Sequence, residues 1–182
     1  MITIITGPSH SGKTLLASKL AMETGALALS IDLLKMGLIR SNHVNLTPED
    51  DTELEIVLWP IVAEMIKTAI ENGQNLIVEG CYIPESWSES FEDKYKQNIN
   101  AFCIVMSEKY IAEHLEDIYA FSRVSERREA QDEPSKDDLI EEHAKYRRAC
   151  ELKAFTCLHI DDKYDIERLY EEIAKANAVE SL

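Results

Sequence analysis

The chain has 182 residues, of which 45% are apolar and 29% are charged, a composition typical of one folded domain with its own hydrophobic core. Its 34 acidic and 19 basic residues give a formal net charge of −15, which repels nucleic acid. We therefore expect a single domain over residues 1–182 with no nucleic-acid partner. A locally positive pocket can still take a small anionic ligand.

The first predicted strand leads straight into a glycine-rich loop. An apolar, β-branched run over residues 2–6 precedes the sequence Gly-Pro-Ser-His-Ser-Gly-Lys-Thr at residues 7–14, which fully matches G-x-x-x-x-G-K-[ST]. Apolar residues at helical spacing follow directly. Because such a loop aims backbone N–H groups and the positive end of a helix at one point, the motif predicts a phosphate-binding site.

The loop residues have separate expected roles. Lys13 is expected to reach the β- and γ-phosphates of ATP, and Thr14 is expected to bind Mg²⁺ through its hydroxyl. His10 is expected to be exposed, with no role as a catalytic base. The remaining part of the phosphate site is expected to come from the loop itself, at Gly7, Ser9, His10, Ser11 and Gly12.

Four further apolar runs predict strands, and amphipathic helical stretches separate them. Together with the first run they place strands at residues 2–6, 27–31, 75–79, 101–106 and 155–160. This alternation predicts an α/β fold of three layers, with a parallel sheet covered by helices on both faces.

Two helix starts carry sequence signals. Residues 47–50, Thr-Pro-Glu-Asp, resemble a capping box with proline at the first helical position, so a helix should begin there and be kinked or restarted near Pro60. Ser135 and Asp138 form a second capping-box pattern. The later Arg147 and Arg148 have Glu151 within helical reach and are interpreted as surface residues paired with it.

Polar residues at the ends of strands two and three are candidates for the site, because open parallel sheets bind ligands at the carboxyl ends of their strands. Glu79 is expected to hold Mg²⁺ or to orient the acceptor, and Gly80 allows a close backbone approach. Asp32 is either a helix N-cap or the base that accepts the proton of an attacking hydroxyl. Lys35 and Arg40 can bind an anionic acceptor, although Arg40 can equally be a surface residue.

Within residues 120–136, the run from 122 to 134 contains almost no apolar residue, so this stretch is predicted to lie on the surface. Arg123 and Arg127 are four residues apart, with Arg128 adjacent, and nearby glutamates can pair with them on a solvated face. Alternatively the stretch is a mobile lid, in which Arg123 and Arg127 act on the transferring phosphoryl group and Arg128 binds the nucleotide.

The four cysteines form no C-x-x-C pair, and the longest apolar run, residues 56–63, is too short to span a bilayer. The chain also opens directly with the predicted first strand. We therefore expect a cytoplasmic protein with reduced thiols and no membrane partner.

The whole chain resembles the P-loop kinases of the adenylate, shikimate and gluconate kinase type, through the loop at 7–14, Asp32 and the arginine-bearing segment after strand four. This resemblance implies a five-stranded parallel sheet of order 2-3-1-4-5 with a short lid at about residues 120–136. Residues 30–35 are similar to the acceptor-side segment of zeta-toxin-like kinases, which implies that Asp32 is the base. Residues 77–84 are similar to the Glu-Gly…Pro segment of 2-phosphoglycerate kinases.

Two motifs of related proteins do not occur in the sequence. The Gly-Phe-Pro-Arg segment of adenylate kinases is missing, and so is the Asn-Lys-x-Asp motif of GTPases. We therefore expect a kinase that transfers the γ-phosphoryl group of Mg-ATP to a hydroxyl of a small, anionic metabolite. The alternatives are a nucleoside or nucleotide kinase, and a regulatory protein that binds ATP without transfer. No motif names the acceptor or the oligomeric state.

Overall fold

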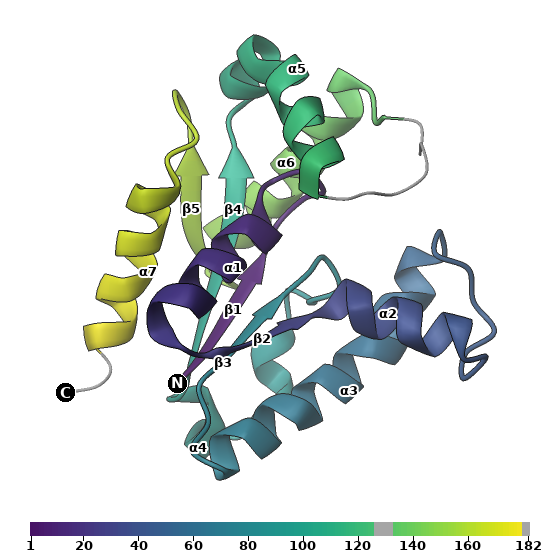
Figure 1. Cartoon of the computed structure of the whole chain (residues 1–182), viewed down its shortest axis with the longest axis vertical. Helices are drawn as coiled ribbons and strands as arrows, with labels where there is room; N and C mark the ends of the chain where they lie inside the picture. The colour runs from purple at the N-terminus through teal and green to yellow at the C-terminus, as the bar shows by residue number, and fades with distance from the viewer. Residues whose placement is uncertain (126–132, 180–182) are drawn as a thin grey trace.

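The computed structural model describes residues 1–125 and 133–179, with residues 122–125 and 179 described in their backbone alone. Within these residues, five strands form one sheet in the order β2-β3-β1-β4-β5, and every neighbouring pair is parallel (Figure 1). The predicted fold class and strand order are confirmed. The strands are β1 (Ile2–Thr6), β2 (Leu27–Ser30), β3 (Leu76–Glu79), β4 (Ile99–Met106) and β5 (Thr156–Ile160).

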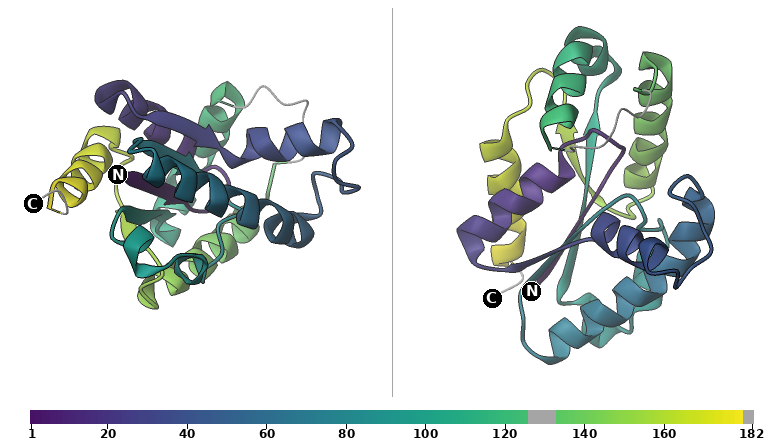
Figure 2. Two further views of the ribbon diagram at one scale, coloured as in Figure 1. Left: turned by 90° about the horizontal axis from the view of Figure 1, so that it is seen from below. Right: turned by 45° about the vertical axis from the view of Figure 1, so that its right-hand side comes forward.

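Helices cover both faces of this sheet (Figures 1 and 2). On one face, α1 and α7 bury Leu16, Leu20, Leu169 and Ile173, and on the other, α3 and α6 contribute Leu58, Val62, Ile66 and Ala149. The central strand β1 is buried along its whole length, so its near-continuous apolar sequence follows from its position. The helices are α1 (Lys13–Thr24), α2 (Ile31–Arg40), α3 (Asp51–Glu71), α4 (Asp93–Lys96), α5 (Glu108–Ser125), α6 (Lys136–Glu151) and α7 (Ile166–Val179), with a 3₁₀ turn at Trp87–Ser90.

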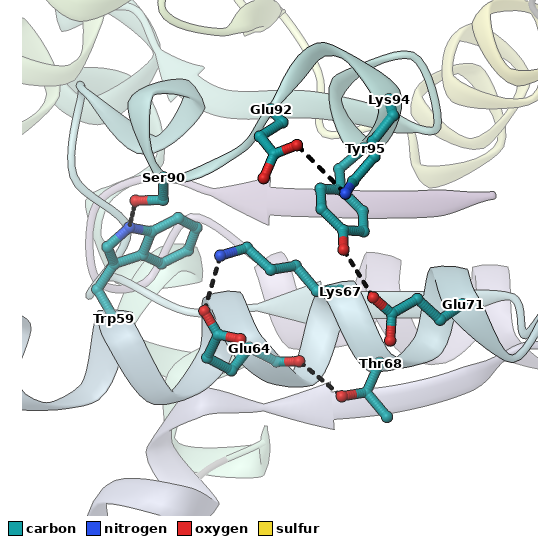
Figure 3. Close-up of polar contacts among 9 residues, drawn as sticks. All are labelled: Trp59, Glu64, Lys67, Thr68, Glu71, Ser90, Glu92, Lys94 and Tyr95. Carbon is teal, nitrogen blue, oxygen red and sulfur yellow. Dashed lines mark hydrogen bonds and ion pairs between the residues drawn. The ribbon is translucent and has the colours of Figure 1, made fainter.

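Polar contacts fasten α3 to the segment that connects β3 to β4 (Figure 3). The indole Nε1 of Trp59 donates to Ser90 Oγ over 2.8 Å, and Tyr95 Oη donates to Glu71 Oε1 over 2.6 Å. The helix passes through Pro60 without a break, so the predicted restart there is wrong. One contact lies near the middle of α3 and the other at its last residue, so both hold the helix against this segment.

Two predicted element boundaries differ from the structure and one agrees with it. Helix α3 begins at Asp51, because the Asp50 carboxylate accepts hydrogen bonds from Thr47 N and Oγ1 and closes a separate turn ahead of the helix. The second strand ends at Ser30, since Ile31 already begins α2. The capping box of Ser135 and Asp138 is confirmed at the start of α6.

The predicted lid covers residues 120–136. Residues 120–125 are the last turn and a half of α5, and α6 begins at Lys136. Arg127 and Arg128 lie outside the described residues, and of Arg123 only the helical backbone is described. Across residues 1–125 and 133–179, no helix has the length and apolar character needed to cross a bilayer.

Candidate active site

The phosphate-binding loop joins the end of β1 to the start of α1. Gly12 caps α1 with φ 85°, and a Cβ at this position would lie 2.4 Å from Tyr164 Oη. Only glycine fits such a combination of left-handed backbone and close contact. Tyr164 in turn donates to the Gly12 carbonyl over 3.3 Å. The loop conformation is therefore fixed by its own sequence and by the segment before α7.

Lys13 lies inside the loop with 7% of its surface exposed, and its Nζ donates to the Pro8 carbonyl over 2.6 Å. Burial lowers the pKa of Lys13, whereas Cys81, Glu79 and Glu142 raise it, and the net direction is upward. Burial raises the pKa of the Cys81 thiol, so Cys81 is neutral, and we assign most of the stabilisation of the cation to the two carboxylates. Lys13 thus carries a buried positive charge at the phosphate site.

Thr14 and Glu79 meet beside this lysine. Thr14 Oγ1, in the first turn of α1, donates to Glu79 Oε2 at the end of β3 over 3.1 Å. Glu79 is 3% exposed, and within the described part of the chain its Oε1 has no hydrogen-bond partner. Because a buried carboxylate oxygen without a partner is costly, this site fits a cation. Hydroxyl and carboxylate oxygens are ligands that Mg²⁺ prefers.

A second cluster forms at the start of α2. Lys35 is 4% exposed, its Nζ lies 3.1 Å from Asp32 Oδ1, and it donates to Tyr82 Oη over 2.8 Å. Lys35 is therefore buried and bonded to two neighbours, whereas Arg40, the last residue of the same helix, is exposed. The N-cap of α2 is Ser30 and Asp32 stands inside the first turn, so the N-cap interpretation of Asp32 is wrong.

Gly80 brings the two clusters together. A Cβ at Gly80 would lie 2.8 Å from Cβ of Ile31, so the end of β3 and the start of α2 can approach only because this residue has no side chain. The next residue, Cys81, donates through Sγ to the Gly7 carbonyl over 3.5 Å. Cys81 lies within electrostatic range of Lys13, Asp32 and Glu142. The segment after β3 therefore connects the phosphate loop to Asp32.

Helix α6 contributes residues that sequence reasoning missed. Glu142 Oε1 accepts a hydrogen bond from Ser9 N of the phosphate loop over 3.1 Å. His143 is 2% exposed, and its Nδ1 accepts from Met106 N over 2.9 Å. Arg147 Nη2 donates to the Met106 carbonyl over 2.9 Å, so its interpretation as a surface residue paired with Glu151 is wrong.

The charge state of His143 follows from its surroundings. Burial, and then the positive charges of Lys13 and Arg147, lower the pKa of His143 to about 3. The ring is therefore neutral at physiological pH and accepts at Nδ1. A signal for its position existed in the sequence, because His143 interrupts the buried stripe of α6 between Leu139 and Ala149.

Other loop residues agree in part with the sequence analysis. Ser11 is buried, and within the described residues its Oγ has no partner, which fits a loop that is shaped for a polar ligand. His10 is half-buried rather than exposed, with φ 63°, and lies near His143. All four cysteines are free thiols, as expected, although only Cys103 is fully buried.

The chain was compared with protein-family models, curated sequences and solved structures, and only solved structures match it. No protein-family model and no curated protein sequence matches the chain. A solved structure of a sugar kinase from Janibacter sp. HTCC2649 is similar, with a TM-score of 0.60 and 18% identity over 98% of this chain and 96% of that chain. A gluconokinase from Sinorhizobium meliloti 1021 gives 0.55 and 14% over 97% and 90%. Shikimate kinase from Aquifex aeolicus vf5 gives 0.54 and 16% over 98% and 99%.

The chain therefore has the fold of the P-loop small-molecule kinases. The resemblance to the shikimate and gluconate kinase type is confirmed at the level of this fold. Identities of this size carry the architecture alone.

Proposed function

We propose that this protein is a phosphotransferase that moves the γ-phosphoryl group of Mg-ATP to a hydroxyl of a small metabolite. The observation that carries the proposal is the contact of Thr14 with Glu79, beside the buried cation of Lys13. A loop that binds only an anion has no need for a buried carboxylate next to its threonine. A metal-bound nucleotide accounts for both the lysine and the carboxylate.

In this function the loop backbone and Lys13 bind the phosphates, and Thr14 and Glu79 hold Mg²⁺, directly or through water. The bound metal ion would neutralise charge that develops on the phosphate oxygens. The same backbone approach at Gly80 that positions Asp32 also shapes the acceptor side. The predicted lid arginines, Arg123, Arg127 and Arg128, would bring further positive charge to the nucleotide.

Asp32 is the proposed base. The acceptor's hydroxyl oxygen bonds to the γ-phosphorus, the bond from that phosphorus to the β,γ-bridging oxygen breaks, ADP leaves and the hydroxyl proton passes to Asp32. The side chain of Asp32 is 30% exposed, so a ligand can reach it. A phosphate acceptor is already anionic and needs no base. A base at Asp32 therefore favours a hydroxyl acceptor over a nucleoside monophosphate.

The acceptor is proposed to be small and anionic, and its charge would be bound by Arg40. Lys35 was expected to share that role, and this stays a prediction. Its contacts with Asp32 and Tyr82 leave it 4% exposed, which favours an indirect contribution.

The test is to incubate the protein with γ-labelled ATP, Mg²⁺ and an extract of small metabolites, and to resolve labelled products by mass. We expect a labelled metabolite with the wild type and none with Lys13→Ala. A labelled nucleotide would favour a nucleoside or nucleotide kinase. ATP binding without any labelled product would contradict phosphotransfer and favour a regulatory protein.

A further inference from the structure

Lys35 lies at the centre of a chain of polar contacts on the acceptor side of the site. Its Nζ lies 3.1 Å from Asp32 Oδ1 and donates to Tyr82 Oη over 2.8 Å, and it also lies 5.0 Å from the centroid of the Tyr82 ring. A buried ammonium group needs such partners, because desolvation of an unpaired charge is costly. Tyr82 therefore fixes the position of the Lys35 charge as much as Asp32 does.

The chain continues from Tyr82 to α3. Tyr82 is 6% exposed, and its Oη donates to Asp51 Oδ1 over 2.7 Å. Burial, together with this hydrogen bond, raises the pKa of Tyr82 well above its ordinary value, so the hydroxyl keeps its proton. The direction of the hydrogen bonds is then fixed, since Lys35 donates to Tyr82 and Tyr82 donates to Asp51.

This arrangement bears on Asp32. Asp32 stands in the first turn of α2, one turn before Lys35, and its carboxylate is paired with an ammonium group that Tyr82 holds in place. A proton acceptor has to lie within hydrogen-bond reach of the acceptor's hydroxyl. A lysine anchored at one end by Tyr82 restricts the rotamer of Asp32, whereas a lysine with Asp32 as its sole partner would move with it.

We propose that Tyr82 is a positioning residue, which fixes Lys35 and through Lys35 the carboxylate of Asp32, while Asp51 fixes Tyr82. The inference rests on the proposed function, in which Asp32 takes the proton of the acceptor. Tyr82 follows Glu79 by three residues, so one short segment after β3 supplies both a metal ligand and the support of the base. Tyr82 touches neither nucleotide nor acceptor in this role.

The experiment uses Tyr82→Phe, which keeps the ring under Lys35 and removes the hydroxyl. We expect transfer of label into the metabolite extract to slow about tenfold or more, with the Kd for Mg-ATP unchanged, because misplacement of a reacting group lowers turnover rather than nucleotide binding. Lys35→Met should slow transfer at least as much. In the Lys35→Met background, Tyr82→Phe should have no further effect, because Tyr82 acts through Lys35.

Two variants of Asp51 separate positioning from general stability. Asp51→Asn keeps an oxygen that accepts from Tyr82 Oη and should retain most of the turnover, whereas Asp51→Ala should reproduce the loss of Tyr82→Phe. Thermal unfolding of each variant shows whether it is folded, and Asp51→Ala replaces Tyr82→Phe if the latter does not fold.

Several outcomes would overturn the inference. These are wild-type turnover in Tyr82→Phe, losses that multiply in the double variant, and a loss of Mg-ATP affinity that accounts for the slower transfer. Failure of the proposed function is recognised separately in the wild type. If the wild type binds Mg-ATP but labels no metabolite, both proposals are wrong. If the wild type labels a metabolite and Tyr82→Phe labels it at the same rate, only the positioning role is wrong.

Discussion

Thr14 Oγ1 donates a hydrogen bond to Glu79 Oε2 over 3.1 Å, and this contact joins two residues that are 65 positions apart in the chain. It connects the first turn of α1 with the end of β3, which are adjacent because β3 pairs with β1 in the sheet. The contact brings together the two expected metal ligands next to Lys13.

Replacing Glu79 by glutamine should weaken Mg-ATP binding by about 10-fold to 100-fold, because the variant removes one charged metal ligand and keeps the shape of the side chain. Titration with ATP in the presence of Mg²⁺, and again with the metal chelated, measures the effect. The loss should occur only with the metal present. Glu89→Gln, an exposed residue beyond the same strand, is the matched control and should bind as the wild type does. Equal loss without metal would contradict the metal role.

Replacing Glu142 by glutamine should tighten nucleotide binding by about tenfold. Glu142 accepts from Ser9 N and lies near Lys13, so its negative charge opposes the arrival of the phosphates. The Kd for Mg-ATP, measured by calorimetry, tests this. Glu141→Gln removes the same charge from the exposed neighbouring position and should change little. An unchanged or weaker affinity of Glu142→Gln would mean that Glu142 supports the loop instead of competing with the ligand.

Gly80→Ala should destabilise the fold by about 1–3 kcal/mol and slow transfer, because the new methyl group would press on Ile31 and displace the start of α2. The free energy of unfolding in denaturant measures the first effect. Gly37→Ala is the matched control, since a Cβ there meets nothing within 4 Å. In the interior of α2 it should stabilise by about 0.5–1 kcal/mol. A Gly80→Ala variant as stable as the wild type would show that the contact relaxes without cost.

His143 should make stability depend on pH. The pKa of His143 is lowered to about 3 in the folded protein, whereas an unfolded histidine has a pKa of about 6.5. Between about pH 6.5 and pH 3 the unfolded chain therefore binds a proton that the folded chain does not bind, and the free energy of unfolding decreases as pH falls through this range. Between pH 7.5 and pH 5 this amounts to about 2 kcal/mol.

Unfolding in denaturant at both pH values checks that prediction. His143→Gln keeps an acceptor for Met106 N and should lose about 2 kcal/mol less than the wild type on acidification. His43→Gln, at an exposed position, should behave like the wild type. An identical pH dependence of the His143 variant and the wild type would show that folding does not lower the pKa of His143.

Much of the fold followed from local patterns. The strands and the loop were predictable because buried parallel strands need continuous apolar runs, and because the loop motif has fixed positions. The approach of Glu79 to Thr14 was predictable as well, since the carboxyl ends of parallel strands share one edge of the sheet. The ends of strands and helices were less predictable. The second strand was expected to end at Ile31, which made Asp32 a candidate N-cap, but α2 begins at Ile31 directly after β2, with no loop between them.

The partners of Lys35 and Ser9 were not predictable from the sequence. Lys35 of α2 contacts Tyr82, which follows β3, and Tyr82 contacts Asp51, the first residue of α3. No local sequence motif predicts a contact among three elements. Glu142 reaches Ser9 because α6 packs through Leu139 and Ala149, and the placement of a helix depends on such packing over the whole core.

The central claim is that Asp32 takes the proton while the loop holds Mg-ATP, and it is tested most directly with Asp32→Asn. The rate of label transfer from γ-labelled ATP and the Kd for Mg-ATP are measured on the same preparations of wild type and variant. We expect an unchanged Kd and a rate reduced by about 10²-fold to 10⁴-fold. Transfer by Asp32→Asn at the wild-type rate would contradict the account.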